Sequence, residues 1–300
     1  MDNAGEIYFT PYKTSTITCN ANIGKNINID LSVLFNNIEI NENKYESIIW
    51  IQNLKGDNQY SRGIYPKKIR KSKKNKNKKN RFDNQVTIIY KITDIYMPNI
   101  KIFKNGNVQL TGLKKIEDTK KIVDKIIENV RNIYINIDKN INTNEEVDYN
   151  ILENLEYCNL CVRLINTDFK TYTRPDEVEK FNIRRKEFHH LLISDKYNNK
   201  SSFQPGIYQG VKLEYYYNDN NNGICSCVFH NYSKNKSWLE NKCKKITIAI
   251  FESGSILITG GVTFEQVDKA YNYITKIISD NMQLIRRPVF VYEKKINHCL

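Results

Sequence analysis

The sequence predicts an α+β fold built from two pseudo-symmetric repeats, each with antiparallel strands and a long helix. The main observation is that IFKNGNVQLTG at 102–112 returns as IFESGSILITG at 250–260, at a constant offset of 148 residues. The same register continues into the following segments, where Glu117 matches Glu265 and Lys121 matches Lys269. A fixed-offset match of a strand pair and a helix indicates a duplicated structural unit.

The first repeat is predicted at 15–135, with a basic insertion at about 53–81. Alternation and apolar runs predict its elements in order: a strand at 15–24, a short helix at 29–38, strands at 45–52 and 81–92, a hairpin at 100–112 and a helix at about 116–131. The last helix has an apolar stripe of Ile116, Val123, Ile127 and Val130, a spacing that places them on one face.

The second repeat is predicted at 155–287, with an insertion at about 218–245. Its elements follow the same order: a strand at 157–165, a charged helical stretch at 175–193, a strand-rich segment at 203–217 and a hairpin at 246–260. A final helix begins at Thr263, and its buried stripe is predicted to hold Phe264, Val267, Tyr271, Ile274 and Ile278.

The net charge of +13 suggests a polyanionic partner, but most of it lies in one segment. Residues 67–81 hold ten Lys and Arg and no acid, so the remainder carries 13 − 10 = +3. Such a run is typical of a solvated loop, of sequence-blind attraction to phosphates, or of a nuclear-import signal. Seven cysteines and a polar start without a signal peptide indicate a reducing intracellular compartment. No apolar run approaches the ~18 residues that span a membrane.

The repeated hairpin decides which side chains share a face. A two-residue turn at Asn105-Gly106 mixes apolar and polar residues on both sides. A three-residue loop at 104–106, with the glycine in a left-handed conformation, separates them. It predicts an aliphatic face of Ile100, Ile102, Val108 and Leu110, and an opposite face of Lys101, Phe103, Asn107, Gln109 and Thr111. The second hairpin then sorts into Ile248, Ile250, Ile256 and Ile258 against Ala249, Phe251, Ser255, Leu257 and Thr259.

The aliphatic faces are expected to pack on the helices that follow, which leaves the opposite faces uncovered. An apolar ring on an otherwise polar, uncovered sheet face indicates a binding surface. The alternative is that an insertion covers Phe103 and Phe251 as a secondary core.

These repeats resemble the TATA-box-binding protein family, and most closely the TATA-binding-like proteins of large DNA viruses. The residues that carry the resemblance are the I-F-x-x-G-x-x-x-(L/I)-T-G hairpins, ITCNANIGKNINIDLSVLF at 17–35 and SSFQPGIYQGVKL at 201–213, and it covers about two thirds of the chain. The resemblance implies a saddle-shaped curved antiparallel sheet with helices on the convex face. It also implies a non-enzymatic transcription initiation factor that binds and bends AT-rich promoter DNA through the minor groove. The expected partners are AT-rich double-stranded DNA, initiation factors and RNA polymerase. The expected location is the nucleus or a cytoplasmic viral factory, with packaging in the virion as a further option.

Site residues carry over one by one from this resemblance. Phe103 and Phe251 match one intercalating wedge of each repeat, and Thr111 and Thr259 match groove-contacting threonines. Asn159 matches a groove-reading asparagine whose first-repeat counterpart is Thr16. Gln109 and Leu257 share the uncovered faces and complete the predicted DNA-binding set.

The partner wedges are left open by the sequence. Phe203 stands one residue early, next to Gln204, and Phe82 or Tyr45 could serve in the first repeat. Asn107 and Ser255 replace lysines that the family places after the hairpin glycine. These departures keep an alternative function open: a TATA-binding-like scaffold that recruits transcription factors or polymerase without sequence-specific bending.

Other chemistry finds little support in the sequence. Cys225, Cys227, His230 and Cys243 are residue types that bind zinc, but the C-x-C spacing is uncommon, so we predict idle thiols, no metal and no cofactor. No phosphate-cradling glycine loop, metalloprotease helix or nucleophile elbow occurs, so we predict no enzyme.

Overall fold

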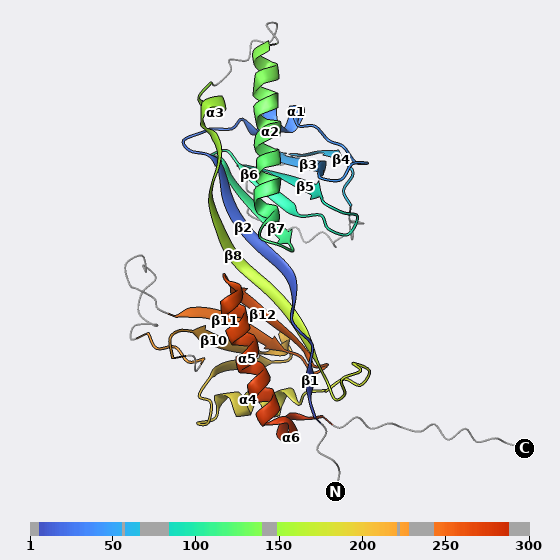
Figure 1. The fold of residues 1–300 in the computed structure, drawn as a ribbon, viewed down its shortest axis with the longest axis vertical. Helices are drawn as coiled ribbons and strands as arrows, with labels where there is room; N and C mark the ends of the chain where they lie inside the picture. The colour runs from blue at the N-terminus through green and yellow to red at the C-terminus, as the bar shows by residue number, and fades with distance from the viewer. Residues whose placement is uncertain are drawn as a thin grey trace, which may run out of the picture. The chain divides into compact units, whose positions relative to one another are not determined.

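The computed structural model describes residues 6–55, 58–66, 84–139, 149–220, 223–227 and 243–287. The chain divides into two compact units, which we describe one at a time (Figure 1). The N-terminal unit is Thr16–Leu164, and the C-terminal unit combines Met1–Ser15 with Ile165–Leu300. Within the described ranges, no helix combines the length and the apolar character needed to cross a membrane.

The N-terminal unit is an antiparallel sheet with the strand order β4-β3-β5-β6-β7-β2, and the first part of β8 follows β2. Its elements are β2 (Lys13–Gly24), α1 (Leu31–Asn37), β3 (Ser47–Lys55), β4 (Asn58–Gly63), β5 (Gln85–Lys91), β6 (Asn99–Phe103), β7 (Asn107–Leu113), α2 (Asp118–Lys139), α3 (Tyr149–Asn154) and β8 (Leu155–Tyr172). Edge strand β4 was not predicted, because its segment lies in what the sequence marks as a polar insertion.

Helix α2 covers one face of this sheet, where it runs across β6 and β7 (Figure 1). The helix buries Val123, Ile126 and Val130 completely, and the aliphatic hairpin residues, Ile100, Ile102, Val108 and Leu110, are at most 1% exposed. The helix runs to Lys139, beyond the predicted end at 131, because Ile133 and Tyr134 continue its buried stripe. Burial of this stripe, at roughly 25 cal/mol per Å² of apolar area, holds the helix on the sheet.

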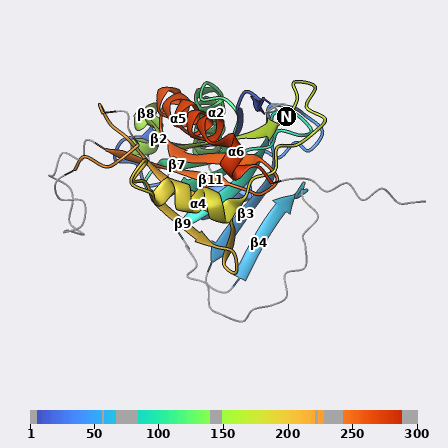
Figure 2. The ribbon, with the colours of Figure 1, turned by 90° about the horizontal axis from the view of Figure 1, so that it is seen from below.

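The C-terminal unit has the strand order β8-β12-β11-β10-β9, with β1 paired to β8. Its elements are β1 (Tyr8–Phe9), the later part of β8, α4 (Arg185–Ile193), β9 (Lys200–Gln204), β10 (Tyr208–Tyr217), β11 (Lys244–Ile250), β12 (Ser255–Gly261), α5 (Phe264–Asp280) and α6 (Met282–Ile285). Figure 2 views this unit from its end, with α5 and α6 adjacent and α4 beside β9. Both units thus have the predicted α+β arrangement of sheet and helices.

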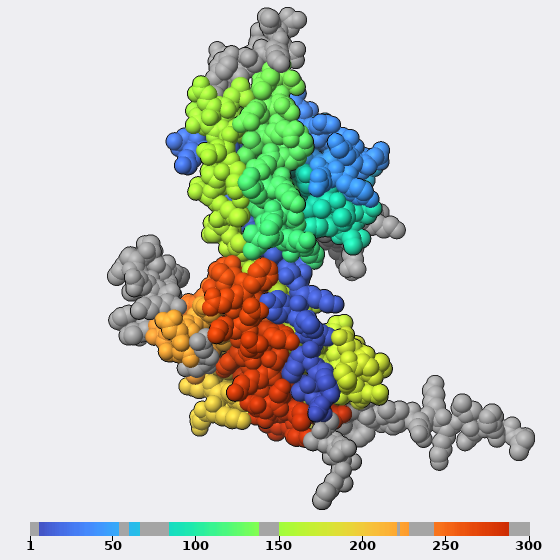
Figure 3. Space-filling model, viewed as in Figure 1, coloured from blue at the N-terminus to red at the C-terminus, as the bar shows by residue number. Residues whose placement is uncertain are grey.

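Helix α5 packs on the sheet of the C-terminal unit, as α2 packs on the sheet of the N-terminal unit. The residues of both helices are visible in Figure 3, where α2 is green and α5 is red. The Thr263 hydroxyl accepts from Gln266 N at 3.3 Å, which confirms the predicted helix start. Val267, Ile274 and Ile278 are buried as predicted. Phe264 is 39% exposed, so its place in the buried stripe was wrong: at the first position of the helix it projects beyond the packed turns.

Two further boundaries differ from the prediction. The helical stretch predicted at 175–193 is helical only from Arg185, because the preceding chain folds back with Thr173 N donating to Glu179 O at 2.9 Å. Strand β8 continues to Tyr172 instead of ending at 165, because its later residues pair with β12 from Ser255 to Gly261.

The three-residue hairpin loop is confirmed in both units. Ile102 pairs with Val108 and Ile250 pairs with Ile256, as that loop length requires. Gly106 and Gly254 have φ angles of 76° and 75°, and their amides donate to Phe103 O and Phe251 O at 3.0 and 3.1 Å. These left-handed glycines set the register, and the register places each phenylalanine opposite the aliphatic face.

Candidate nucleic-acid interface

The side of each sheet that faces away from the helices is called the open face below. In the N-terminal unit it carries Lys101, Phe103, Gln109 and Thr111, all partly exposed. Strand β2 adds a polar row, since Asn20 pairs with Gln109, Asn22 with Asn107 and Thr18 with Thr111. Amide and hydroxyl groups therefore lie around the Phe103 ring on the described part of this open face.

A shallow groove lies beside Phe103 on this face. Its lining includes Asn20, Asn22, Asn107, Gln109, Asn159 and Arg163. Asn22 Nδ2 donates to Asn107 Oδ1 at 3.0 Å, and Asn22 Oδ1 accepts from Gly24 N at 2.8 Å. The structure thus brings Phe103, Gln109 and Asn159 together.

Asn159 enters the groove from β8 with a φ of 56°, in the left-handed region that asparagine tolerates better than most residues. This conformation breaks the strict alternation of the strand, so Cys158, whose thiol lies 4.0 Å from Asn22 Oδ1, also approaches the open face. Although the resemblance matches Asn159 to the second repeat, its side chain lines the groove of the N-terminal unit.

The groove has no acidic lining residue in the part of the chain that the structure describes, and Arg163 contributes a positive charge. With its amide oriented to satisfy both groups, Asn20 Oδ1 accepts from Arg163 Nε at 3.0 Å. A neutral amide surface with a cation at its margin suits a ligand that offers hydrogen-bond acceptors between anionic rims.

The open face of the C-terminal unit carries Phe251, Leu257 and Thr259. The ring of Tyr208, on the neighbouring strand β10, lies 5.7 Å from the ring of Phe251, and both side chains are partly exposed. Lys212 Nζ lies 4.2 Å from the centre of the Tyr208 ring. This face is more highly charged than that of the N-terminal unit.

Two acids contribute to that charge. Asp168 pairs with Leu257 across the strands and accepts a hydrogen bond from the Ser15 hydroxyl. Glu214 lies 3.1 Å from Lys200 and 3.5 Å from Lys245. Burial alone tends to raise the pKa of Glu214, but the Tyr216 hydroxyl and the two lysines outweigh it and hold the pKa below its usual value.

The two threonines are equivalent in the two hairpins. Thr111 Oγ1 donates to Asn99 O at 3.3 Å, and Thr259 Oγ1 donates to Thr247 O at 3.4 Å. Each bond crosses to the paired residue of the neighbouring strand and orients the side chain. Thr16, the proposed counterpart of Asn159, has a separate role: its hydroxyl accepts from Gly112 N at 3.0 Å.

Phe203 does not share the open face with Phe251, which corrects its assignment as a partner wedge. Ser202 pairs with Lys212, so Ser202 shares the open face and Phe203 points to the opposite side. There the Arg185 guanidinium lies 5.4 Å from its ring centre and the His189 ring lies 6.5 Å away. Both contacts come from helix α4.

Of the two first-repeat candidates for a partner wedge, the described part of the chain contains only Tyr45. Tyr45 borders a pocket with Asp118, Lys121 and Lys125 of α2, so it lies on the helix side. Phe82 and the basic run 67–81 lie outside the described residues.

Sequence reasoning missed Asn20, Asn22, Arg163 and Tyr208 as members of these surfaces. The alternation of apolar and polar residues in β2 could have identified two of them. The buried positions of this strand are Ile17, Cys19, Ala21 and Ile23, and they alternate with Thr16, Thr18, Asn20 and Asn22. That alternation places both asparagines on the face that Gln109 shares.

Comparison with known protein families assigns two segments of the chain to one family. The family model described as "Transcription factor TFIID (or TATA-binding protein, TBP)" matches residues 48–133 and 207–281, more than half of the chain. Each matched segment contains one hairpin with its phenylalanine and the following helix.

The chain is also similar to individual proteins. A "TATA-box-binding protein-like" protein of Acanthamoeba polyphaga mimivirus is 30% identical over 271 residues, which cover 89% of this chain and 65% of that protein. The chain therefore spans about two thirds of the length of that curated relative. The solved structure of Methanococcus jannaschii TBP aligns with a TM-score of 0.44 at 14% sequence identity. The aligned region covers 90% of this chain and 99% of the Methanococcus jannaschii chain. On the strength of the family match, this chain belongs to the TATA-binding protein family.

Proposed function

We propose that this protein is a non-enzymatic transcription initiation factor that binds AT-rich promoter DNA through the minor groove and bends it. Its partners are then AT-rich duplex DNA and the initiation factors and polymerase that assemble on it. The observation that carries the proposal is that Phe103 and Phe251 lie partly exposed at equivalent hairpin positions, each on the open face of its unit.

The side chains around Phe103 suit the floor of a minor groove. Adenine N3 and thymine O2 present only acceptors there, whereas guanine adds an amino group that obstructs close contact. The amides of Asn20, Gln109 and Asn159 offer donors to such acceptors. This chemistry separates A·T from G·C pairs without reading individual bases.

The two rings provide the means to bend the duplex. An aromatic wedge that enters a base step unstacks it at a cost of a few kcal/mol, which is offset because bent DNA contacts more protein surface. Pyrimidine–purine steps such as TA unstack most easily, so the same wedge favours AT-rich sites. Phe103 and Phe251 act as these wedges, one in each repeat.

The basic run 67–81 adds affinity of a different kind. Ten cations without acids attract phosphates regardless of sequence, and each phosphate contact steepens the salt dependence of binding. Its contribution is therefore separable from that of the wedges.

A fluorescence bending assay tests the proposal. An AT-rich duplex with TA steps, labelled at both ends, is mixed with wild type, with Phe103→Ala/Phe251→Ala, or with a deletion of 67–81, at two salt concentrations. We expect the double variant to lose the bend at saturating protein. We expect the deletion to keep the bend but to bind more weakly, with a shallower salt dependence.

Phe203→Ala is the matched control, since it removes the same ring from the helix side of a sheet. We expect it to bend DNA like wild type. Circular dichroism melts establish that each variant is folded. The wedge mechanism is wrong if the folded double variant bends the duplex as strongly as wild type.

One observation favours the scaffold as a second candidate. In the described part of the chain, Phe203 and Tyr45 lie on the helix sides, so each open face presents one wedge candidate instead of two. A scaffold predicts that wild type binds the duplex without bending it, and that deletion of 67–81 abolishes this binding.

A further inference from the structure

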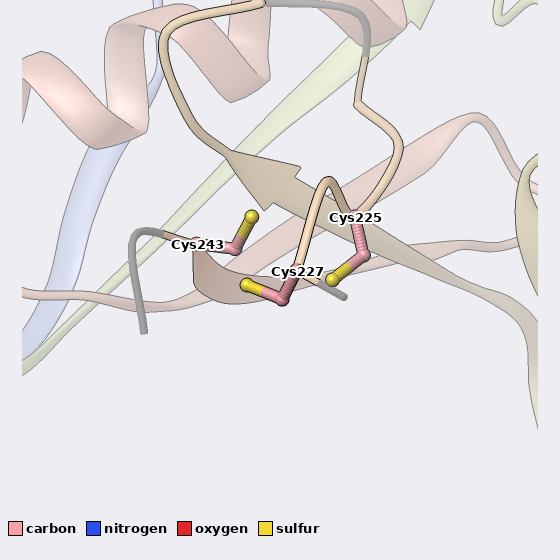
Figure 4. Close-up of side chains that lie close together, drawn as sticks. All are labelled: Cys225, Cys227 and Cys243. Carbon is pink, nitrogen blue, oxygen red and sulfur yellow. The ribbon is translucent and has the colours of Figure 1, made fainter. Parts of the chain in front are cut away.

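Three cysteine side chains meet in the C-terminal unit (Figure 4). Cys225 and Cys227 follow strand β10, and Cys243 immediately precedes β11. Their sulfur atoms all lie within 4.8 Å of one another, and all three residues are partly buried. Sixteen positions separate Cys227 from Cys243 in the sequence, so the fold and not the local chain brings them together.

Hydrogen bonds to the sheet fix the segment that carries the first two cysteines. Tyr216 N donates to Gly223 O at 3.0 Å, and Asn218 Nδ2 donates to Ile224 O at 2.7 Å. Gly223 has a φ of 74° and packs so closely on Tyr273 that a Cβ there would lie 2.7 Å from the tyrosine ring. The cluster is therefore held by contacts that do not depend on the cysteines themselves.

The surroundings of Cys243 favour a thiolate. Asn218, only 5% exposed, also directs Nδ2 to Cys243 Sγ at 3.3 Å, and Ser226 N donates to the same sulfur at 3.4 Å. Ser226 Oγ lies 3.4 Å from it as well. Amide donors to a sulfur stabilise the anionic form, and such outer contacts orient the thiolate ligands of metal sites.

The donor set selects the class of ion. Thiolates are soft ligands that bind zinc, whereas magnesium and calcium require oxygen. Zinc binds thiolates at about 2.3 Å in tetrahedral geometry, which places the sulfur atoms about 3.8 Å apart. Small side-chain rotations bring sulfur atoms that lie within 4.8 Å of one another to that spacing.

We propose that Cys225, Cys227 and Cys243 bind one Zn²⁺ ion through three thiolates. The ion joins the chain that leaves β10 to the chain that enters β11, and so closes the insertion at its base. The fourth ligand is solvent or another donor. The role that we propose is structural, since the three thiolates come from the two chain segments at the base of the insertion.

Metal analysis of the full-length protein tests this assignment. Protein purified under reducing conditions and reconstituted with ZnCl₂ is desalted, and its zinc is measured by inductively coupled plasma mass spectrometry. We expect one zinc per chain in wild type. We expect Cys225→Ser/Cys227→Ser/Cys243→Ser to lose that zinc, and the matched control Cys158→Ser/Cys161→Ser to retain it.

Cobalt substitution of wild type gives a second readout that does not depend on a folded variant. Thiolate-to-cobalt charge-transfer absorption, displaced by one equivalent of Zn²⁺, supports the site. Wild type without stoichiometric zinc and without this absorption overturns the proposal. A disulfide within the cluster under the same conditions, detected as an intact mass 2 Da lower, also overturns it. Zinc that the triple variant retains would overturn it as well.

Discussion

The rings of Tyr208 and Phe251 lie 5.7 Å apart, with an angle of 59° between their planes. Gly210, on the same strand as Tyr208, makes this contact possible, since a Cβ there would lie 2.9 Å from the Tyr208 ring and 3.2 Å from the Phe251 ring. The proposed wedge of the C-terminal unit is therefore supported from the adjacent strand.

This ring pair predicts a measurable coupling. Tilted aromatic pairs contribute about 0.5–1.5 kcal/mol beyond their buried area. A double-mutant cycle of Tyr208→Ala and Phe251→Ala in urea unfolding should give a coupling energy in that range. Tyr45→Ala paired with Phe251→Ala serves as the control, because these residues belong to different units, and should give additive effects. Additivity for the Tyr208 cycle would contradict the contact.

Gly254 should be the least replaceable glycine of the second hairpin. Its φ of 75° disfavours any side chain, and an added Cβ would lie 2.2 Å from Thr171 Oγ1 and 2.5 Å from Phe181 O. We expect Gly254→Ala to lower the free energy of unfolding by roughly 2–4 kcal/mol. Gly206→Ala is the control, since nothing lies within 4 Å of a Cβ there, and it should change stability little. Equal urea midpoints for the two variants would count against this turn geometry.

If the open face of the C-terminal unit contacts DNA, the negative charge of Asp168 should lower the affinity of the wild-type protein for DNA. Its carboxylate shares that face with Leu257 and accepts from the Ser15 hydroxyl. Removing one charge that repels phosphates should raise affinity about twofold to fivefold at low salt, with less effect at high salt. Titrations of a labelled AT-rich duplex with Asp168→Asn measure this. Glu179→Gln, which removes an acid that belongs to no strand and lies 4.0 Å from Arg286, should not reproduce the gain.

Stability should decrease slightly in mild acid because of His189. Burial, and then the charge of His190, lower the pKa of His189 below 6.5, and its Nδ1 lies 3.0 Å from Ser201 Oγ. The unfolded chain therefore takes up this proton at a higher pH than the folded protein. The stabilisation that neutral His189 contributes to the folded protein is fully present above about pH 6.5. It is lost as the pH falls through the lower pKa that His189 has in the folded state. His189→Asn should reduce the difference between urea midpoints at pH 7 and pH 5, whereas His190→Asn should retain most of it.

Much of the hairpin geometry could be predicted from local pattern alone. Alternation over a few residues and a glycine at a fixed position were enough to assign Ile102 and Val108 to one face and Phe103 to the other. These features depend on neighbours in the chain, whose geometry is fixed by the period of a strand and by the left-handed turn. The extra length of α2 and β8 was not predictable in this way, because it depends on burial against distant segments.

The sequence by itself determined the duplication, the α+β class and the face on which Phe103 and Phe251 lie. Only the tertiary structure decided that Asn159 joins Phe103 in one groove, that Phe203 faces α4, and that Cys243 meets Cys225 and Cys227. The physical reason is that a shift of one residue in strand pairing moves a side chain to the opposite face. Pairing between distant strands sets that register, and a motif within one strand does not contain it.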